Sequence, residues 1–145
     1  MVNHYSFLKS VIGFLVILSI LSACAGPRVV KEDEKADLRN RINEYWQYRI
    51  KGDVERAYQM EVPLFREKYS VLHYMNRFRL VRYLDAEVQE LRIEGKEATS
   101  TVKLTHVVLL KGLSNKKLTK LEQEKWINIK SAWYHVPEES EMKKE

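Results

Sequence analysis

The spacing of apolar residues changes once along this chain of 145 residues, near Leu80. Before that point, Leu38, Ile42 and Trp46 recur at steps of four, which places them on one face of a helix. After it, apolar and polar residues alternate over residues 98–110, which is typical of a half-buried strand. Helices followed by strands predict an α+β fold, with N-terminal helices packed on one face of an antiparallel sheet.

The boundaries of these elements follow from turn and capping residues. Gly52 ends the first helix and Asp53 caps the second, while Pro63 suits the first turn of a third. We expect helices over residues 37–51, 54–60 and 63–68, a looser segment as far as residue 79, and strands over residues 83–93, 98–110, 118–130 and 132–136. A strongly curved sheet of about four strands around the first helix would make a cone with an open mouth.

An apolar run precedes the domain, over residues 11–21. It is about half the ~20 residues that a membrane-spanning helix needs, but it suits the core of a signal peptide. The residues that follow, Leu21-Ser22-Ala23-Cys24, resemble the lipobox of bacterial lipoproteins. The resemblance implies signal cleavage between Ala23 and Cys24 and lipidation of Cys24. Two alternatives are an ordinary cleaved signal that ends in A-x-A and a short uncleaved anchor.

This interpretation divides the chain into four parts. Residues 1–23 form a cleaved lipoprotein signal peptide, residues 24–36 a flexible tether, residues 37–137 the cone-like domain and residues 138–145 a disordered tail. Acyl chains on Cys24 would anchor the domain to a membrane of the cell envelope. Because Ala25, rather than Asp, follows Cys24, family sorting rules favour the outer membrane, facing the periplasm, in a Gram-negative host.

Composition and motifs exclude several classes of site. A single Cys allows no internal disulfide and no thiolate zinc cluster. The chain contains no H-E-x-x-H, P-loop, G-x-G-x-x-G or G-x-S-x-G motif, and His73 and His135 lack metal-ligand spacing. We therefore predict no metal and no cofactor.

The net charge of +5 is modest. Its densest stretch interleaves Arg77, Arg79 and Arg82 with aromatic residues. Outside the cytoplasm this pattern favours lipid headgroups or an acidic protein partner over nucleic acid. The alternative is that this arginine-rich stretch is only a solvent-exposed strand edge.

The folded part also resembles a known superfamily. The first two helices carry the pattern Tyr45-Trp46-x-x-Arg49-x-x-Gly52-Asp53-x-x-x-Ala57-Tyr58. It is similar to the first-helix signature of the nuclear transport factor two-like superfamily, the cystatin-like cone. Trp126 and the run Trp133-Tyr134-His135-Val136 resemble its closing hairpin, although Ser131-Ala132 stands where members often carry a glycine turn. The resemblance implies a cone that hosts isomerases, dehydratases, transport and assembly modules, and lipoproteins.

His106 is the sequence's weak candidate for catalysis. Alternation places it on the same face as Val102 and Leu104, where an imidazole could act as a general base. A carboxylate partner could come from the preceding strand, whose acidic residues are Asp85, Glu87 and Glu90, although the solvent face suits these better. The residues expected at the pocket are Tyr48, His106, Trp133 and Tyr134, and those expected in the core are Trp46, Tyr58 and Trp126.

The sequence thus predicts a membrane-anchored, non-enzymatic envelope lipoprotein that binds a partner protein or a small apolar ligand. Two alternatives stay open. One is an enzyme of isomerase or hydrolase type that uses His106 with a carboxylate. The other is an assembly subunit that forms a homodimer through its sheet.

Overall fold

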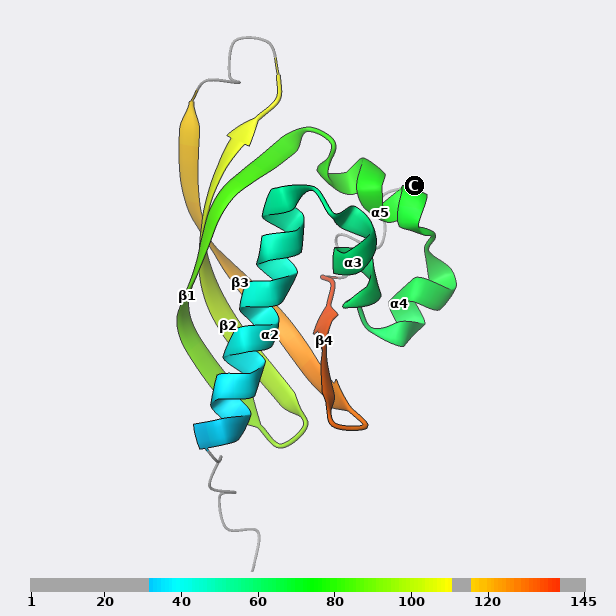
Figure 1. Ribbon diagram of the computed structural model, residues 1–145, viewed down its shortest axis with the longest axis vertical. Coiled ribbons are helices and arrows are strands. Elements are labelled where there is room, and N and C mark those ends of the chain that lie inside the picture. Colours follow the sequence, from blue (N-terminus) through cyan, green and yellow to red (C-terminus); the bar gives the residue numbers. More distant parts are fainter. Residues whose placement is uncertain (1–31, 111–115, 139–145) are drawn as a thin grey trace, which may run out of the picture.

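The computed structural model describes residues 32–110 and 116–138 (Figure 1). The predicted signal peptide, Cys24 and the predicted tail from residue 139 onward lie outside these residues. Four helices precede four strands: α2 (Glu32–Lys51), α3 (Val54–Gln59), α4 (Pro63–Lys68), α5 (Val71–Phe78), β1 (Val81–Glu94), β2 (Glu97–Val108), β3 (Lys117–Ile129) and β4 (Ala132–Val136). Within the described residues, no helix is both long enough and apolar enough to cross a bilayer.

The strands form one antiparallel sheet in the order β1-β2-β3-β4, and the predicted α+β fold is confirmed. Figure 1 shows α2 lying across one face of the curved sheet, with α3, α4 and α5 gathered beside one end of it. The helix buries Leu38, Ile42, Tyr45 and Trp46, spaced three or four residues apart. This stripe belongs to the same core as Trp126 of β3, which, like Trp46 and Tyr58, is buried as expected.

The first helix starts earlier than the sequence suggested. It begins at Glu32, so residues 32–36 belong to α2 and not to the expected tether. Its first turn contains Glu32, Asp33 and Glu34, and carboxylates there interact favourably with the positive end of the helix dipole. The charged segment of residues 32–36, which the sequence predicted to be part of a tether, therefore forms the start of α2.

The expected boundaries around α3 and α4 are confirmed. Gly52 adopts a positive φ of 74°, the left-handed conformation that ends many helices. The Asp53 side chain accepts a hydrogen bond from the backbone N–H of Arg56 at 3.2 Å, and Pro63 occupies the first turn of α4.

The segment that was expected to be loose contains a further helix, α5. Its N-cap is Ser70, whose hydroxyl accepts from the backbone N–H of His73 at 3.2 Å. Tyr74 and Phe78, four residues apart, lie toward the core, and only Tyr74 is fully buried. A helix of eight residues with one buried side chain gives too few repeats for periodicity to be recognised.

The alternation in β2 holds only as far as Leu104. Ala98, Ser100, Val102 and Leu104 are buried, but Val107 is the next buried residue, in place of His106 or Val108. The shift lies opposite an irregularity in β1 between Tyr83 and Asp85. A bulge of this kind raises the local twist and turns the following residues away from the core.

The closing hairpin keeps its register without glycine. Lys130 and Ser131 both have positive φ values, 51° and 67°, so the turn is made at the cost of two strained residues. It pairs Trp126 with His135. Beyond β4 lies the segment after α3, where Val62 N–H donates to the His135 carbonyl and His135 N–H donates to the Met60 carbonyl, each at 2.9 Å. This bridge brings Glu61 beside His135.

Candidate functional site

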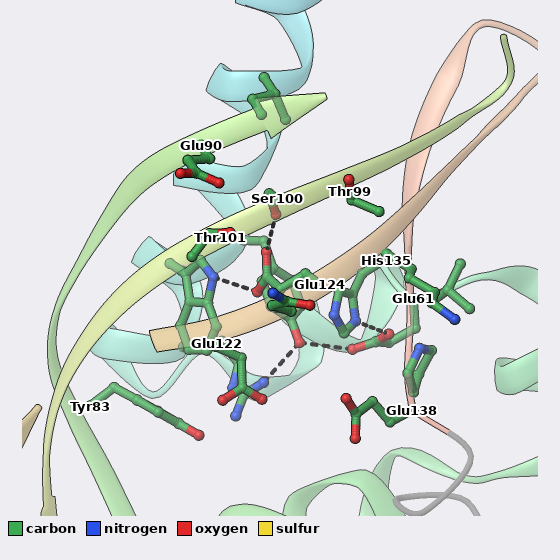
Figure 2. Close-up of a pocket in the computed structure, with 18 of the residues that line it drawn as sticks. Glu61, Tyr83, Glu90, Thr99, Ser100, Thr101, Glu122, Glu124, His135 and Glu138 are labelled. Carbon is green, nitrogen blue, oxygen red and sulfur yellow. Dashed lines mark hydrogen bonds and ion pairs between the residues drawn. The ribbon is translucent and has the colours of Figure 1, made fainter. Parts of the chain in front are cut away.

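A cavity of about 970 Å³ opens between α2, the end of α5 and the sheet, where β4 stops short of the full length of β3. Figure 2 shows Glu61 and His135 pointing toward one another within it, and the Glu124 carboxylate turned toward Ser100. Its walls combine aromatic rings, such as Trp46, with charged groups. This mixture suits a site that both buries and orients a small molecule.

Glu61 and His135 form the most buried ion pair of the cavity. The Nδ1 atom of His135 lies 2.7 Å from Oε2 of Glu61, and the two side chains are 12% and 1% exposed. Burial by itself lowers the pKa of His135, but the Glu61 charge and hydrogen bond, with help from Glu124, raise it above its usual value. The Tyr45 ring stacks on the imidazole with centroids 4.8 Å apart, which fixes the ring plane.

A network of hydroxyls joins this pair to Arg49. The Tyr45 hydroxyl donates to Oε1 of Glu61 at 2.9 Å and accepts from Nη1 of Arg49 at 2.8 Å. The Tyr74 hydroxyl lies 3.1 Å from that of Tyr45 and also accepts from Nη1 at 3.3 Å. One polar cluster therefore contains side chains from α2, from α5 and from the segment at Glu61.

The Arg49 guanidinium is surrounded by aromatic rings. Its central carbon lies 3.5 Å from the centroid of Phe78 and 5.0–5.6 Å from those of Tyr45, Trp46, Tyr74 and Tyr83. Burial would lower the pKa of Arg49, but the three tyrosines and Glu61 raise it, so the group keeps its charge. Its Nη2 atom is buried and has no hydrogen-bond partner among residues 32–110 and 116–138.

Glu124 joins α2 to the sheet at the cavity wall. Oε1 accepts from the Trp46 indole at 2.8 Å, and Oε2 accepts from Ser100 at 2.9 Å and the Trp126 indole at 3.2 Å. Burial raises the pKa of this carboxyl, while His135 and the three donors oppose the rise. Three elements thus meet on one carboxylate.

The pKa values of the two histidines of the sheet, His135 and His106, are shifted in opposite directions. The pKa of His135 lies above the ordinary 6.5 because of Glu61, and that of His106 lies below it because of burial and the nearby Lys120 charge. A pH titration followed by NMR, with the signals assigned by His135→Gln and His106→Gln, measures both. A His135 signal that titrates below that of His106 would contradict the described pairing.

The raised pKa of His135 determines how the stability of the folded protein changes with pH. The contribution of the His135–Glu61 pair is fully present below the unfolded pKa, near 6.5, and is lost as pH rises through the raised folded pKa. His106 acts in the opposite sense, since its folded pKa is lowered. The difference in unfolding free energy between wild type and His135→Gln, followed from pH 6 upward, isolates the first contribution and should shrink.

The structure places His106 away from this cavity. It lies beside Tyr83, with ring centroids 6.1 Å apart, and its buried Nδ1 atom has no hydrogen-bond partner among the residues that the structure describes. In the described part of the chain, no carboxylate forms a hydrogen bond or ion pair with it. The sequence's weak catalytic candidate therefore lacks both the partner and the pocket that a general base requires.

The other residues expected at the pocket also lie elsewhere. Tyr48 is partly buried against the core and donates to Oε1 of Glu44 at 2.8 Å, and Tyr134 is half-buried on β4. Trp133 is buried and lines a separate small hollow beside Gly95. Neither Tyr48, Tyr134 nor Trp133 lines the large cavity.

The three arginines expected to bind headgroups or a partner do not form one patch. Arg77 is half-buried, lines the cavity and lies over the Phe78 ring at 5.2 Å. Arg79 and Arg82 are exposed. The exposed pair alone is left to contact a headgroup or an acidic surface.

Four residues of the cluster were not among the site residues predicted from the sequence, namely Arg49, Glu61, Glu124 and His135. Two signals pointed to three of them. Arg49 follows Tyr45 by four residues on the buried helix face. Glu124 and Trp126 share one face of β3, and His135 pairs with Trp126 across the hairpin. Glu61 has no such signal, because it lies between helices in a segment without a period.

The chemistry available to this cluster is proton transfer and hydrogen bonding. A carboxylate at Nδ1 holds the His135 ring so that Nε2 faces away from Glu61, the arrangement that a general acid or base needs. No group of three His, Cys, Asp or Glu within residues 32–110 and 116–138 could hold a metal ion.

Two sequence comparisons gave no relative. No protein-family model matches the chain, and no curated protein matches it.

Solved structures do match. The solution structure of a SEC-C motif containing protein from Rhodopseudomonas palustris is 11% identical, with a TM-score of 0.57 over 67% of this chain and 73% of that one. The crystal structure of a SEC-C motif containing protein from Psychrobacter arcticus is 10% identical, with a TM-score of 0.56 over 71% of this chain and 60% of that one. At these identities the two structures show a shared fold alone.

A third structure, described as an NTF2-like transpeptidase from Campylobacter jejuni, is 12% identical over 70% of this chain and 99% of that one. Its TM-score is 0.44, and no conclusion follows from that similarity.

Proposed function

We propose that this chain is a lipid-anchored protein of the cell envelope whose domain binds a small molecule in the cavity beside Arg49 and His135. The observation that carries the proposal is the cavity itself. It has a volume of about 970 Å³, aromatic walls and a cluster of polar groups at its floor. Sites for small molecules typically have about 300–1,000 Å³, with few polar groups among apolar ones.

The anchor rests on the sequence Leu21-Ser22-Ala23-Cys24. Lipidation of Cys24 would confine the domain to a membrane surface, and in a Gram-negative host to the outer membrane facing the periplasm. In cells that express the full chain, wild type should incorporate labelled palmitate and Cys24→Ser should not. Equal labelling of the two proteins would refute the anchor. Ser19→Ala, a change of the same kind of side chain before the lipobox, serves as the control and should label normally.

The relation to the nuclear transport factor two-like superfamily belongs to this proposal. It is supported by the Tyr45-to-Tyr58 signature and by helices packed on a curved antiparallel sheet. The superfamily includes lipoproteins and binding modules, which agrees with an anchored domain that presents a pocket. A fold of this kind does not determine a particular reaction, so the function has to be inferred from the cavity.

Native mass spectrometry of the full chain, gently extracted from its own membrane, tests the binding function. We expect a reproducible adduct of small mass that is absent from the Arg49→Met variant and retained by Arg82→Met, which changes an exposed arginine outside the cavity. A co-purifying protein without an adduct, or a homodimer that forms through the sheet, would contradict the small-molecule proposal and favour an interaction module.

A second candidate function is an enzyme of isomerase or hydrolase type. The specific observation in its favour is the 2.7 Å contact of Glu61 with Nδ1 of His135, in a cavity that His106 does not reach. In this alternative His135 is the general base and Glu61 orients it. The adduct, once identified, decides between the two: incubation with wild type converts it and His135→Gln does not if the protein is an enzyme, whereas a binding protein releases it unchanged.

A further inference from the structure

At the floor of the cavity, the groups that still need a hydrogen-bond partner are N–H donors. All four oxygens of Glu61 and Glu124 already have hydrogen-bond partners within the chain. One buried nitrogen of the cluster, Nη2 of Arg49, has no partner within the described part of the chain. The contact of His135 with Glu61 uses Nδ1 and leaves Nε2 outside the pairing. What the site lacks is therefore an acceptor.

The lack of an acceptor has a larger energetic consequence for Arg49 than for His135. A guanidinium always carries its charge, and its N–H groups can only donate. Leaving such a group buried without an acceptor costs free energy that the other contacts of the chain have to offset. The Glu61 carboxylate is joined to Arg49 through the Tyr45 hydroxyl. The acceptor for Nη2 has to come from outside the described part of the chain.

The walls around this atom indicate the rest of the ligand. Trp46, Phe78 and Tyr83 all line the cavity and lie within 5.3 Å of the guanidinium carbon, measured to the ring centroids. Rings in this arrangement favour a flat, apolar body next to the charged group. The Phe78 ring lies closest, with its centroid 3.5 Å from the guanidinium carbon.

We propose that the cavity binds an organic carboxylate with an aromatic or flat apolar body, and that its anionic group accepts a hydrogen bond from Nη2 of Arg49, with Nε2 of His135 as a second donor. The inference rests on the proposed binding function and names its ligand class. A cationic ligand would have to share carboxylate oxygens of Glu61 and Glu124 that each already accept a hydrogen bond within the chain. The carboxylates nearer the surface are not matched to it either, since Glu90 is exposed to water and Glu122 pairs with Lys120.

Two matched probes test the charge preference in the full chain. 2-Naphthoate and 2-naphthamide share one ring system and differ in the anionic group. Isothermal titration at pH 6 should show naphthoate binding at least ten times more tightly than naphthamide. Arg49→Met should reduce this ratio several-fold, to the part that His135 supplies, and the control Arg82→Met should keep it.

The dependence on pH tests the second donor. The groups that face His135 are Glu61, Glu124, Arg49 and the rings of Tyr45 and Trp126. Because His135 donates from Nε2 only when it is protonated, naphthoate should bind more weakly as pH rises through the pKa of this residue. His135→Gln should remove that dependence, while naphthamide should show none in either protein.

Each outcome bears on the proposal. If Arg49→Met does not fold, as judged by circular dichroism, Arg49→Lys replaces it; a lysine keeps the charge without the fork geometry and should retain a reduced preference. Equal affinity of wild type for the two probes would overturn the carboxylate class and leave the binding function standing. No binding of either probe at millimolar concentration would overturn it too, and the native adduct would then decide the binding function separately.

Discussion

Glu61→Leu should lower the free energy of unfolding by about 3–5 kcal/mol, the cost typical of breaking a buried ion pair by removing one partner. The carboxylate is 1% exposed, accepts from the Tyr45 hydroxyl at 2.9 Å and lies 2.7 Å from Nδ1 of His135. Leucine replaces neither contact, so the Tyr45 hydroxyl loses Glu61 as its acceptor and the buried imidazole loses its charged partner. Urea unfolding at pH 6, where the pair contributes fully, measures the effect.

The control for this change is Glu67→Leu on α4. Glu67 is exposed, and a surface substitution of this kind changes stability by about 0.5 kcal/mol or less. The double variant Glu61→Leu/His135→Phe should recover part of the loss, because an apolar pair of similar volume often replaces a buried ion pair at little cost. A loss below about 1 kcal/mol for Glu61→Leu alone would mean that the pair is solvated and the cluster more open than described.

Glu124→Gln should cost about 2–4 kcal/mol, since hydrogen bonds to a charged group contribute roughly 1.5–3 kcal/mol each and a buried unpaired donor adds its own penalty. Every neighbour of this carboxylate is a donor: the indoles of Trp46 and Trp126 and the Ser100 hydroxyl. An amide replaces one accepting oxygen by an NH₂ group, which then faces at least one donor. Unfolding followed by tryptophan fluorescence reports both the loss and its location.

Glu122→Gln is the matched control for this second change. Glu122 lies two residues away on the same strand and is half-exposed, and its ion pair with Lys120 lies at the surface. Surface pairs contribute between about 0 and 1 kcal/mol. Equal losses for Glu122→Gln and Glu124→Gln would show that the three donors do not depend on Glu124.

Local signals predicted much of the fold. Gly52, Asp53 and Pro63 act within a few residues of themselves, so their effects on helix ends could be worked out without knowledge of the tertiary structure. Residues 98–104 alternate because the sheet there is regular. The alternation fails at His106 because of a bulge in the neighbouring strand, which the sequence of β2 does not contain.

The cluster at the cavity was harder to predict, for a physical reason. Arg49, Glu124 and His135 lie on faces that Tyr45 and Trp126 mark as buried, but polar residues on such faces read as exceptions to the hydrophobic pattern. Glu61 reaches His135 only through a bridge between residues 74 positions apart. Nothing local distinguishes its carboxylate from those on the surface. The functional groups became visible only when the tertiary contacts were known.

The central claim is that a ligand binds in the cavity beside Arg49, and the three tryptophans of the chain offer a direct test. The Trp46 indole lies at the cavity wall and donates to Glu124, whereas Trp133 lies in a separate hollow. We would record the indole N–H signals of the full chain by NMR while 2-naphthoate is added. The expected result is a shift of the Trp46 signal that saturates, with the Trp133 signal unmoved. A shift of Trp133 alone, or of no indole at saturating naphthoate, would contradict the claim.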